Sequence, residues 1–390
     1  MREGADSPAG LAVHPDDRPA NSVSMTDSRA TAFIYSDAYR QFDYGLHHPL
    51  RIERLSRTVD YCRAAGLLAL PGVRMVESRE ATEVELASFH TGEYLAALRA
   101  ADGGHLPEGA GAFGLGSGDN PVFPGVFAWS RLYAGASLQA MELVDSGAAA
   151  CAFNIAGGLH HAAPARASGF CYVNDAGVCI AHLLRRGRRV AYVDIDAHHG
   201  DGVQDAFDET DRVLTISLHE TGQTLFPGTG AAEEIGRGAG IGYAVNVPLW
   251  PGTDDTVFLW AFDRVVPPLL AAYAPDVVVT QLGIDTHRAD PLAHLALSTG
   301  GFAAAVRRLR SLCPRWIALG GGGYNVAVVA RGWAWAWAIM NDRELPGEAE
   351  SGPGGPDDSP STPGLQGQAW EFARDQVRRV ERLAFPYHGL

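Results

Sequence analysis

The rest of the chain is organised around Val190-Ala-Tyr-Val-Asp-Ile-Asp-Ala-His-His-Gly-Asp201. This stretch starts as an apolar run, as a buried parallel strand would, and ends in acidic residues and histidines. Because side chains alternate along a strand, Asp194, Asp196 and His198 should share one face at its carboxyl end, where open α/β sheets bind ligands. Two carboxylates and an imidazole that converge there need a cation to hold them together.

A single aspartate near a histidine would more often cap the next helix while the histidine packs nearby. Here Asp201 and a second histidine, His199, crowd into the same short segment. Aspartate oxygen and histidine nitrogen are ordinary ligands of zinc and other divalent transition metals. The stretch therefore predicts a metal site.

Three other strand ends carry reactive residues. Ala150–Ile155 has the pattern of a buried strand and leads into Gly157-Gly-Leu-His-His161, while Asp276–Asp285 is an apolar strand that ends in an aspartate. Trp316–Leu319 is followed by Gly320-Gly-Gly-Gly-Tyr324, whose glycines let the backbone wrap closely around a site. These segments add two histidines, an aspartate and a tyrosine to the predicted site.

The overall composition excludes several classes of protein. Hydrophobic residues make up 46% of the 390 residues, enough for a large core, and the net charge of -14 argues against nucleic-acid or anionic-membrane partners. The five cysteines show neither disulfide nor Cys-x-x-Cys spacing, which predicts a reducing, cytoplasmic location. We expect no signal peptide and no membrane-spanning segment, and the oligomeric state stays open.

Strands and helices alternate along the chain, which predicts an α/β fold with a mainly parallel sheet and helices on both faces. We expect one domain over residues 31–342, after a disordered tail over residues 1–30. A flexible linker rich in Gly, Pro, Ser and Asp should follow over residues 343–368. Residues 369–390 should form a C-terminal helix and tail that dock on the same domain.

Several motifs, taken together, resemble those of the zinc-dependent histone deacetylase family, and their order and spacing agree over roughly Phe33 to Met340. They are Gly157–His161, Asp194–Asp201, Phe226-Pro-Gly-Thr-Gly230, Gly283-Ile-Asp285 and Gly320–Tyr324. Within the family the chain most resembles the bacterial acetoin-utilisation-type deacetylases, which are close to class I. The resemblance implies a single arginase/deacetylase-type domain with a parallel eight-stranded sheet flanked by helices.

The resemblance also implies roles for the residues at the site. The catalytic metal, zinc with iron(II) as the alternative, would be bound by Asp196, His198 and Asp285. A general acid/base pair would be formed by His160 and His161, oriented by Asp194 and Asp201 respectively. Tyr324 would donate to the substrate carbonyl.

A narrow acyl-lysine tunnel and potassium sites are further implications of the resemblance. The tunnel residues would be Gly169, Phe170 and Phe226 along the wall, Leu292 and Asp119 at the rim, and Arg54 beneath, near an acetate exit. The potassium sites would fall on Asp194, Asp196, His198, Ser217 and Leu218, and on Phe207, Thr210, Val213 and Tyr243.

The implied activity is removal of acetyl groups from lysine side chains of proteins or peptides, by metal-activated water with a histidine pair and an oxyanion-stabilising tyrosine. Small acylated amines such as acetylpolyamines are the alternative substrates, although Asp119 favours a peptide. A two-manganese ureohydrolase would need a second aspartate where this chain has Gly283. A non-catalytic acyl-lysine-binding module would not need His160, His161 and Tyr324.

Overall fold

A central sheet of eight parallel strands, in the order β2-β1-β3-β8-β7-β4-β5-β6, organises the structure. The structure is a computed structural model that describes Met1, residues 30–345 and residues 363–390. The strands are β1 Thr31–Tyr35, β2 Val73–Glu77, β3 Cys151–Asn154, β4 Val190–Asp194, β5 Val213–Glu220, β6 Ala244–Leu249, β7 Val277–Gln281 and β8 Trp316–Leu319. The predicted parallel eight-stranded α/β fold is confirmed.

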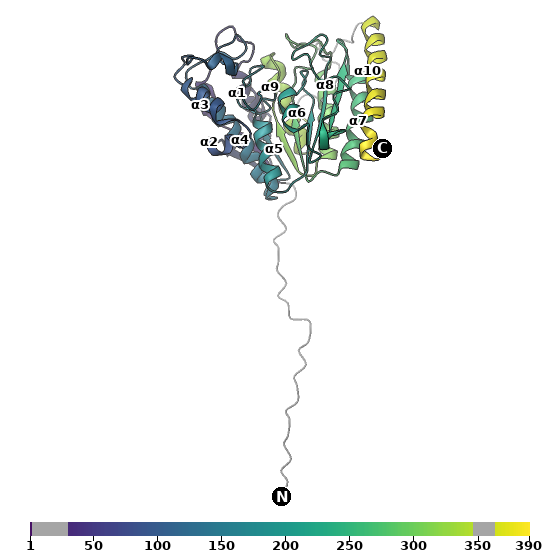
Figure 1. Cartoon of the computed structure of the whole chain (residues 1–390), viewed down its shortest axis with the longest axis horizontal. Coiled ribbons are helices and arrows are strands. Elements are labelled where there is room, and N and C mark those ends of the chain that lie inside the picture. Colours follow the sequence, from purple (N-terminus) through teal and green to yellow (C-terminus); the bar gives the residue numbers. More distant parts are fainter. Residues whose placement is uncertain (2–29, 346–362) are drawn as a thin grey trace.

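Helices cover both faces of the sheet (Figure 1). They are α1 Glu53–Ala64, α2 Glu83–Leu86, α3 Gly92–Ala100, α4 Val126–Asp145, α5 Asp175–Arg185, α6 Asp201–Phe207, α7 Asp255–Tyr273, α8 Thr299–Leu312, α9 Val326–Met340 and α10 Pro363–Leu383. One row of contacting helices runs α3–α4–α5–α6, and the other runs α1–α9–α8–α7–α10. Right-handed crossovers place the two rows on opposite faces, since the chain moves along the sheet in opposite directions through them.

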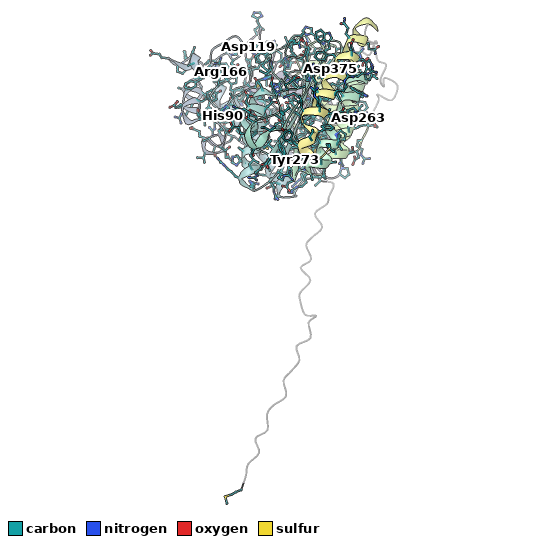
Figure 2. The ribbon with its side chains drawn as sticks, turned by 45° about the vertical axis from the view of Figure 1, so that its right-hand side comes forward. His90, Asp119, Arg166, Asp263, Tyr273 and Asp375 are labelled. Carbon is teal, nitrogen blue, oxygen red and sulfur yellow. The ribbon has the colours of Figure 1, made fainter. Side chains whose placement is uncertain are left out.

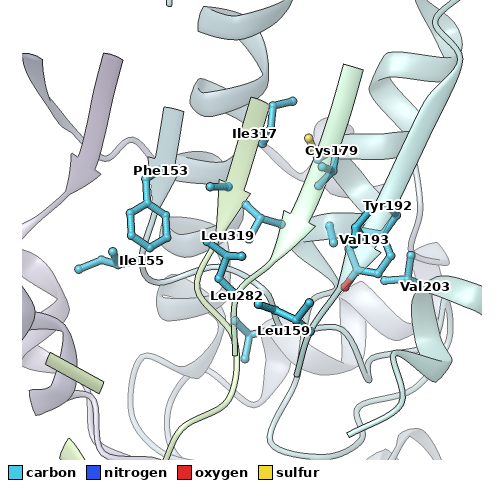
Figure 3. Packing of buried hydrophobic residues seen from close by; sticks show 14 of the residues in the cluster. Phe153, Ile155, Leu159, Cys179, Tyr192, Val193, Val203, Leu282, Ile317 and Leu319 are labelled. Atoms are coloured by element: carbon cyan, nitrogen blue, oxygen red, sulfur yellow. The ribbon is translucent and has the colours of Figure 1, made fainter. Parts of the chain in front are cut away.

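The core is formed where apolar strand residues meet the helices (Figure 3). The side chains of Phe153, Val193, Ile317 and Leu319 are fully buried, as expected for parallel strands covered on both faces. Trp333 on α9 is fully buried as well. All five cysteines are buried and free, as their spacing predicted.

Two features of the chain differ from the prediction made from residue patterns. Strands β2 and β6 were not predicted as separate elements, and they are the two edge strands. Most of β2 is exposed, so it needs no continuous apolar run, and β6 is buried but its apolar run is interrupted by Asn246 and Pro248. The helix expected from residue 369 begins at Pro363, so the linker predicted over 343–368 is too long. A proline is well tolerated in the first turn of a helix, where its missing N–H costs no hydrogen bond. The tail predicted over residues 1–30 and most of the linker lie outside the described residues.

Helix α10 lies against α7 and β6 and so covers that edge of the sheet (Figure 1). Phe372 packs on Trp250 with ring centroids 5.1 Å apart, and Trp370 packs on Trp260 at 5.3 Å. In the part of the chain that the structure describes, we find no helix with the length and apolarity needed to cross a bilayer.

Candidate active site

The candidate site lies at the carboxyl edge of β3, β8, β7 and β4, which are neighbours at the centre of the sheet. Each loop that leaves this edge carries one of the sequence motifs: 155–162 after β3, 320–325 after β8, 282–298 after β7 and 195–200 after β4. Because parallel strands end at a common edge, loops far apart in the sequence meet there.

The three predicted metal ligands come together at this edge. Asp196, His198 and Asp285 are buried, and one potential ligand atom of each lies within 4.8 Å of the others. The His198 Nδ1 atom is 3.1 Å from Asp196 Oδ1 and 2.9 Å from Asp285 Oδ2. Burial and the negative charge of Asp196 raise the pKa of Asp285 to about 7, which shows how poorly two adjacent carboxylates tolerate this site without a cation.

Protein donors hold the remaining carboxylate oxygens of this metal-ligand trio. Asp196 Oδ2 accepts from the Gln281 side-chain amide at 2.5 Å and from the Gly322 backbone N–H at 2.7 Å. Asp285 Oδ1 accepts from the Ala197 N–H at 2.8 Å. These bonds fix the rotamers and leave Asp196 Oδ1, Asp285 Oδ2 and His198 Nδ1 facing one another. The donor set therefore fits a single divalent transition metal.

Glycines pack directly against the trio. A Cβ atom added to Gly322 would lie 2.1 Å from Asp285 Oδ2, and one added to Gly283 would lie 2.1 Å from Asp196 Oδ2. Position 283 therefore has no room for the aspartate that a second metal would need. This steric limit argues against the two-manganese ureohydrolase alternative.

His160 and His161 are adjacent in the chain and differ in their surroundings. His160 Nδ1 lies 2.8 Å from Asp194 Oδ2, and His161 Nδ1 lies 2.7 Å from Asp201 Oδ1. Their Nε2 atoms are 3.0 Å apart, so one donates to the other. Each imidazole thus has the carboxylate partner that the resemblance implied.

The two histidines have opposite pKa shifts. Burial alone would lower the pKa of His160, but the carboxylates of Asp194 and Asp196 raise it to about 9. Burial lowers the pKa of His161 to about 4, and the neighbouring charge on His160 adds to this, against the pull of Asp201. At neutral pH the pair therefore consists of one imidazolium and one neutral imidazole.

Tyr324 lies beside the trio, with its ring centroid 6.4 Å from that of His198. Burial and the nearby carboxylates of Asp285 and Asp196 raise its pKa well above the ordinary value, so the hydroxyl stays protonated and can donate. Its backbone N–H donates to Asp290 Oδ2 at 2.8 Å. The other Asp290 oxygen accepts from the Leu292 N–H at 2.9 Å, which ties Tyr324 to the predicted rim residue.

Two phenylalanine rings flank the site. Phe226 lies 5.1 Å from His161 between ring centroids, and Phe170 lies 5.6 Å from Tyr324. Phe226 is 45% exposed, so it reaches the surface. Gly169 has a positive φ of 51°, and a Cβ there would lie 2.5 Å from the His161 ring, so only glycine fits. The predicted wall residues are thus brought together around the histidine pair.

Asp119 is exposed at the outer end of the site. Figure 2 shows it at the end of the molecule opposite Tyr273, the last residue of α7, and so on the carboxyl side of the sheet. Its carbonyl oxygen is 3.2 Å from His48 Nε2, and the His48 ring packs on Phe170 at 4.5 Å. This contact ties the Asp119 loop to the aromatic wall.

Arg54, the predicted acetate-exit residue, contacts the segment that carries Tyr324. Its guanidinium is buried, donates to the Gly323 carbonyl at 2.9 Å and lies over the Trp333 ring at 5.1 Å. Within the described part of the chain, its Nε has no hydrogen-bond partner. A buried cation with a free donor is suited to a small anion.

The residues predicted for potassium fall into two neighbouring groups. In the first group, Asp194 of β4 is the register partner of Ser217 of β5. Leu218 is the next residue of β5, and Asp196 and His198 follow the end of β4. Near the start of β5, the Thr210 N–H donates to the Phe207 carbonyl at 3.2 Å, and the Tyr243 carbonyl accepts from Thr215 at 2.9 Å.

The sequence analysis missed residues that orient the site without standing in a recognised motif. Gln281, which holds Asp196, could have been found as the polar end of the Val277–Gln281 strand. Asp290, which links Tyr324 to the rim, is a second acid in the 282–298 loop that also carries Asp285. Neither sequence feature predicts which residue Gln281 or Asp290 binds, because the hydrogen-bond partners depend on how the loops fold.

Comparison with known proteins gives a consistent result. A model of the histone deacetylase domain matches residues 48–340. The acetoin utilization protein AcuC of Bacillus subtilis is 41% identical over 320 residues, covering 80% of this chain and 82% of AcuC. Histone deacetylase RPD3 of Saccharomyces cerevisiae is 38% identical over 332 residues, covering 83% of this chain and 76% of RPD3. The crystal structure of an HDAC homologue from Aquifex aeolicus has a TM-score of 0.80 at 34% identity and covers 90% of this chain and 100% of its own.

Proposed function

The chain belongs to the histone deacetylase family, and we propose from this premise that it hydrolyses the amide bond of acetylated lysine side chains in proteins or peptides. The observation that carries the proposal is a buried histidine pair beside the metal-ligand trio. His160 Nε2 is 3.9 Å from Asp196 Oδ1, so both groups can reach one substrate amide. The aromatic rings of Phe170 and Phe226 beside the pair suit the apolar stem of a lysine side chain.

A divalent metal would be held by Asp196, His198 and Asp285. When bound, it polarises the substrate carbonyl and lowers the pKa of water from about 15.7 to about 7. Zinc is the proposed ion, with iron(II) as the alternative, because two carboxylates and one imidazole suit either.

His161 is the proposed general base. Asp201 binds its Nδ1–H, so Nε2 is the atom that would take a proton from the attacking water, in place of the contact that it makes with His160 Nε2 at 3.0 Å. The same nitrogen then returns the proton to the leaving lysine amine as the C–N bond breaks, giving acetate and the free amine. His160, kept cationic by Asp194, would stabilise negative charge that develops on the substrate.

Tyr324 and Arg54 have complementary proposed roles. The protonated Tyr324 hydroxyl would donate to the carbonyl oxygen as that oxygen gains charge in the transition state. The buried guanidinium of Arg54 would receive the acetate product beneath the site.

Potassium is proposed as a structural ion near Asp194 and near the start of β5. The residues of both groups offer backbone carbonyls, such as those of Phe207 and Tyr243. These are hard oxygen donors of the kind that alkali cations prefer. Such an ion beside Asp194 would also weaken the effect of this carboxylate on His160.

We propose a peptide or protein as the substrate because Asp119 is exposed beside the aromatic wall. Its carboxylate can accept from backbone N–H groups of an extended peptide on either side of the acetyl-lysine. Acetylpolyamines are the second candidate, since they present the same acetylated amine without a peptide backbone.

An activity screen separates these two substrates. Acetyl-lysine peptides and acetylpolyamines are compared by kcat/KM on wild-type protein and on Asp119→Asn. We expect peptides to be preferred and the variant to lose activity toward peptides alone. Preference for acetylpolyamines, with no effect of Asp119→Asn, would identify a small-amine deacetylase.

The metal assignment is tested by Asp285→Asn. This change removes one charged ligand while preserving the shape of the side chain, so most metal and most activity should be lost. Metal content by elemental analysis and turnover are measured beside Asp263→Asn, a surface control. Full metal content with normal turnover in Asp285→Asn would contradict the assignment.

A further inference from the structure

Asn174 and Asp175 begin helix α5 and have no part in the roles proposed above. Both side chains are fully buried, although asparagine and aspartate are usually exposed. An aspartate in the first turn of a helix can simply favour the positive end of the helix dipole. The contacts of these two residues point elsewhere, to the loop that carries the histidine pair.

Asp175 binds the loop on the side that precedes the histidines. Its Oδ2 accepts from the Gly158 N–H at 3.0 Å, and its Oδ1 accepts from the Leu159 N–H at 2.9 Å. Ser137 on α4 donates its hydroxyl to Oδ2 at 2.6 Å and so holds the carboxyl group from behind. Burial raises the pKa of Asp175, and the hydrogen bonds from Ser137, Leu159 and Gly158 oppose this rise.

Asn174 binds the same loop at and beyond the histidines. Its side-chain amide donates to the His160 carbonyl at 3.1 Å and to the Ala162 carbonyl at 2.9 Å. Its Oδ1 accepts from the Gly177 N–H at 2.8 Å and caps α5. The helix start and the loop are therefore joined through one side chain.

The backbone bonds within the loop are short-range: the Gly157 N–H donates to the Asn154 carbonyl at 3.3 Å and the His160 N–H to the Gly158 carbonyl at 3.0 Å. The loop leaves β3 without forming a helix or strand, and Gly158 has a positive φ of 86°. A Cβ on Gly157 would lie 2.4 Å from Asp175 Oδ2, so the backbone approaches the carboxyl group as closely as glycine allows. The metal-ligand trio follows other strands, β4 and β7, and from that side the Gln281 side-chain amide donates to the Gly158 carbonyl at 3.3 Å, a longer contact than those of Asp175 and Asn174.

We propose that Asn174 and Asp175 are positioning residues that hold the histidine pair at its working distance from the metal-ligand trio. Backbone groups on both sides of His160 and His161 are fixed to one rigid helix start. A displacement of a catalytic group by about 1 Å can cost on the order of 10²-fold in rate. The proposal rests on the proposed deacetylase function, because the rate is defined by that reaction.

The first test is Asp175→Asn. The amide keeps the volume of the side chain but presents N–H donors where the loop also presents N–H donors, so one contact becomes repulsive. On an acetyl-lysine peptide, kcat should fall by about 10–100-fold with KM and metal content little changed. The matched control is Val178→Ala, a buried change on the same helix that leaves the contacts to the loop in place. It should lower Tm while keeping kcat.

The second test, Asn174→Ser, applies even where Asp175→Asn fails to fold. Serine can still cap α5 but cannot reach both carbonyls, so the helix is kept while the loop is released. Asn174→Ser should lower kcat as Asp175→Asn does. Either variant folding with wild-type kcat would overturn the proposal, and so would Val178→Ala losing as much kcat as they do at the same loss of Tm.

A spectroscopic measurement separates this proposal from the proposed function. In histidine-labelled protein, the Nδ1–H protons bound to Asp194 and Asp201 give NMR signals that need no turnover. These signals should shift in both variants and stay unchanged in Val178→Ala. Shifted signals in a protein without deacetylase activity would refute the proposed function alone, while unshifted signals in an active protein would refute the positioning role.

Discussion

At the scale of single residues, the most instructive contrast is between His160 and His161. The two side chains are chemically identical and their rings lie 4.0 Å apart between centroids. Three carboxylates, those of Asp194, Asp196 and Asp201, raise the pKa of His160, whereas His161 has the single carboxylate of Asp201 and lies beside two other histidines, His160 and His198. The protein thus gives two identical side chains opposite pKa shifts by placing different charges around them.

This contrast predicts unequal effects of the two alanine variants. His161→Ala removes the proposed general base and should lower turnover by about 10²–10⁴-fold, whereas His160→Ala should cost less. Steady-state kinetics of both variants, with metal content measured beside them, is the test. A greater loss in His160→Ala at unchanged metal content would reverse the two roles.

Tyr324→Phe is a second prediction at this scale. It keeps the ring packed against Phe170 and deletes only the hydroxyl donor. Because the bond to the carbonyl oxygen strengthens in the transition state, kcat should fall by roughly 10²–10³-fold with Tm and metal content little changed. An effect confined to KM would mean that Tyr324 only lines the site.

At the scale of elements, the loop around residue 164 and helix α5 are joined by a buried histidine. His90 Nδ1 lies 3.2 Å from the Pro164 carbonyl, and its Nε2 accepts from the Asn174 N–H at 3.0 Å. Burial lowers the pKa of His90 from 6.5 to about 4. The neutral imidazole is thus built into the contact.

This histidine predicts a defined acid sensitivity. Below pH 6.5 His90 takes up a proton in the unfolded chain, but in the folded protein it stays neutral down to about pH 4. The contribution of His90 to the free energy of unfolding is therefore fully present above pH 6.5 and is lost as the pH falls from 6.5 to about 4. From pH 7.5 to 4.5 this term amounts to about 2–3 kcal/mol. Between these two pH values, the free energy of unfolding measured with urea should fall by that much less in His90→Gln than in the wild type. An equal loss in the variant and the wild type would contradict the prediction.

Helix α10 is the other element whose role can be measured. Val377 is buried against the domain, and the adjacent Arg378 is exposed. Val377→Ala should lower the free energy of unfolding by about 2 kcal/mol, since two buried methyl groups are removed. Arg378→Ala on the same helix should stay within about 0.5 kcal/mol of wild type. Equal effects of the two changes in urea unfolding would mean that α10 is not docked.

At the scale of the whole molecule, the chain contains no lysine: all 31 of its Lys and Arg residues are arginine. Arginine keeps its charge at any pH that the fold survives and cannot be acetylated as an amine. Every ion pair of the described residues therefore relies on arginine or histidine as its cation. A lysine deacetylase of this composition cannot be a substrate of its own reaction through its side chains.

Chemical acetylation should consequently leave the enzyme active. Treatment with an amine-selective acetylating reagent, followed by hydroxylamine to cleave esters, should add no side-chain acetyl groups and leave kcat/KM unchanged. Intact-mass measurement accompanies the kinetics. Loss of activity that survives hydroxylamine would mean that a group other than a lysine amine is modified at the site.

The sequence alone determined which candidate groups lie at the site and which strands lead to them. The apolar runs before Asp194 and Asp285, the glycines before His160 and Tyr324, and the alternation of strands with helices are local patterns. Each pattern has a physical cause that acts within a few residues. A buried strand requires apolar side chains, a close backbone approach requires glycine, and a metal site requires ligands of a suitable chemical type. For this reason a metal site at this sheet edge and the parallel α/β fold could be predicted from local patterns, whereas the choice of Asp196, His198 and Asp285 as its ligands came from the resemblance to a family.

Only the tertiary structure decided how these groups face one another. The order β3-β8-β7-β4 places the loop at 155–162 beside the loop at 320–325, far away along the chain, and no spacing along the chain encodes that order. The edge strands β2 and β6, the bond from Gln281 to Asp196 and the attachment of the histidine loop to Asn174 and Asp175 were all invisible beforehand. A hydrogen bond or a pKa shift depends on distance and burial, and both arise from packing between distant segments rather than from the residues that carry them.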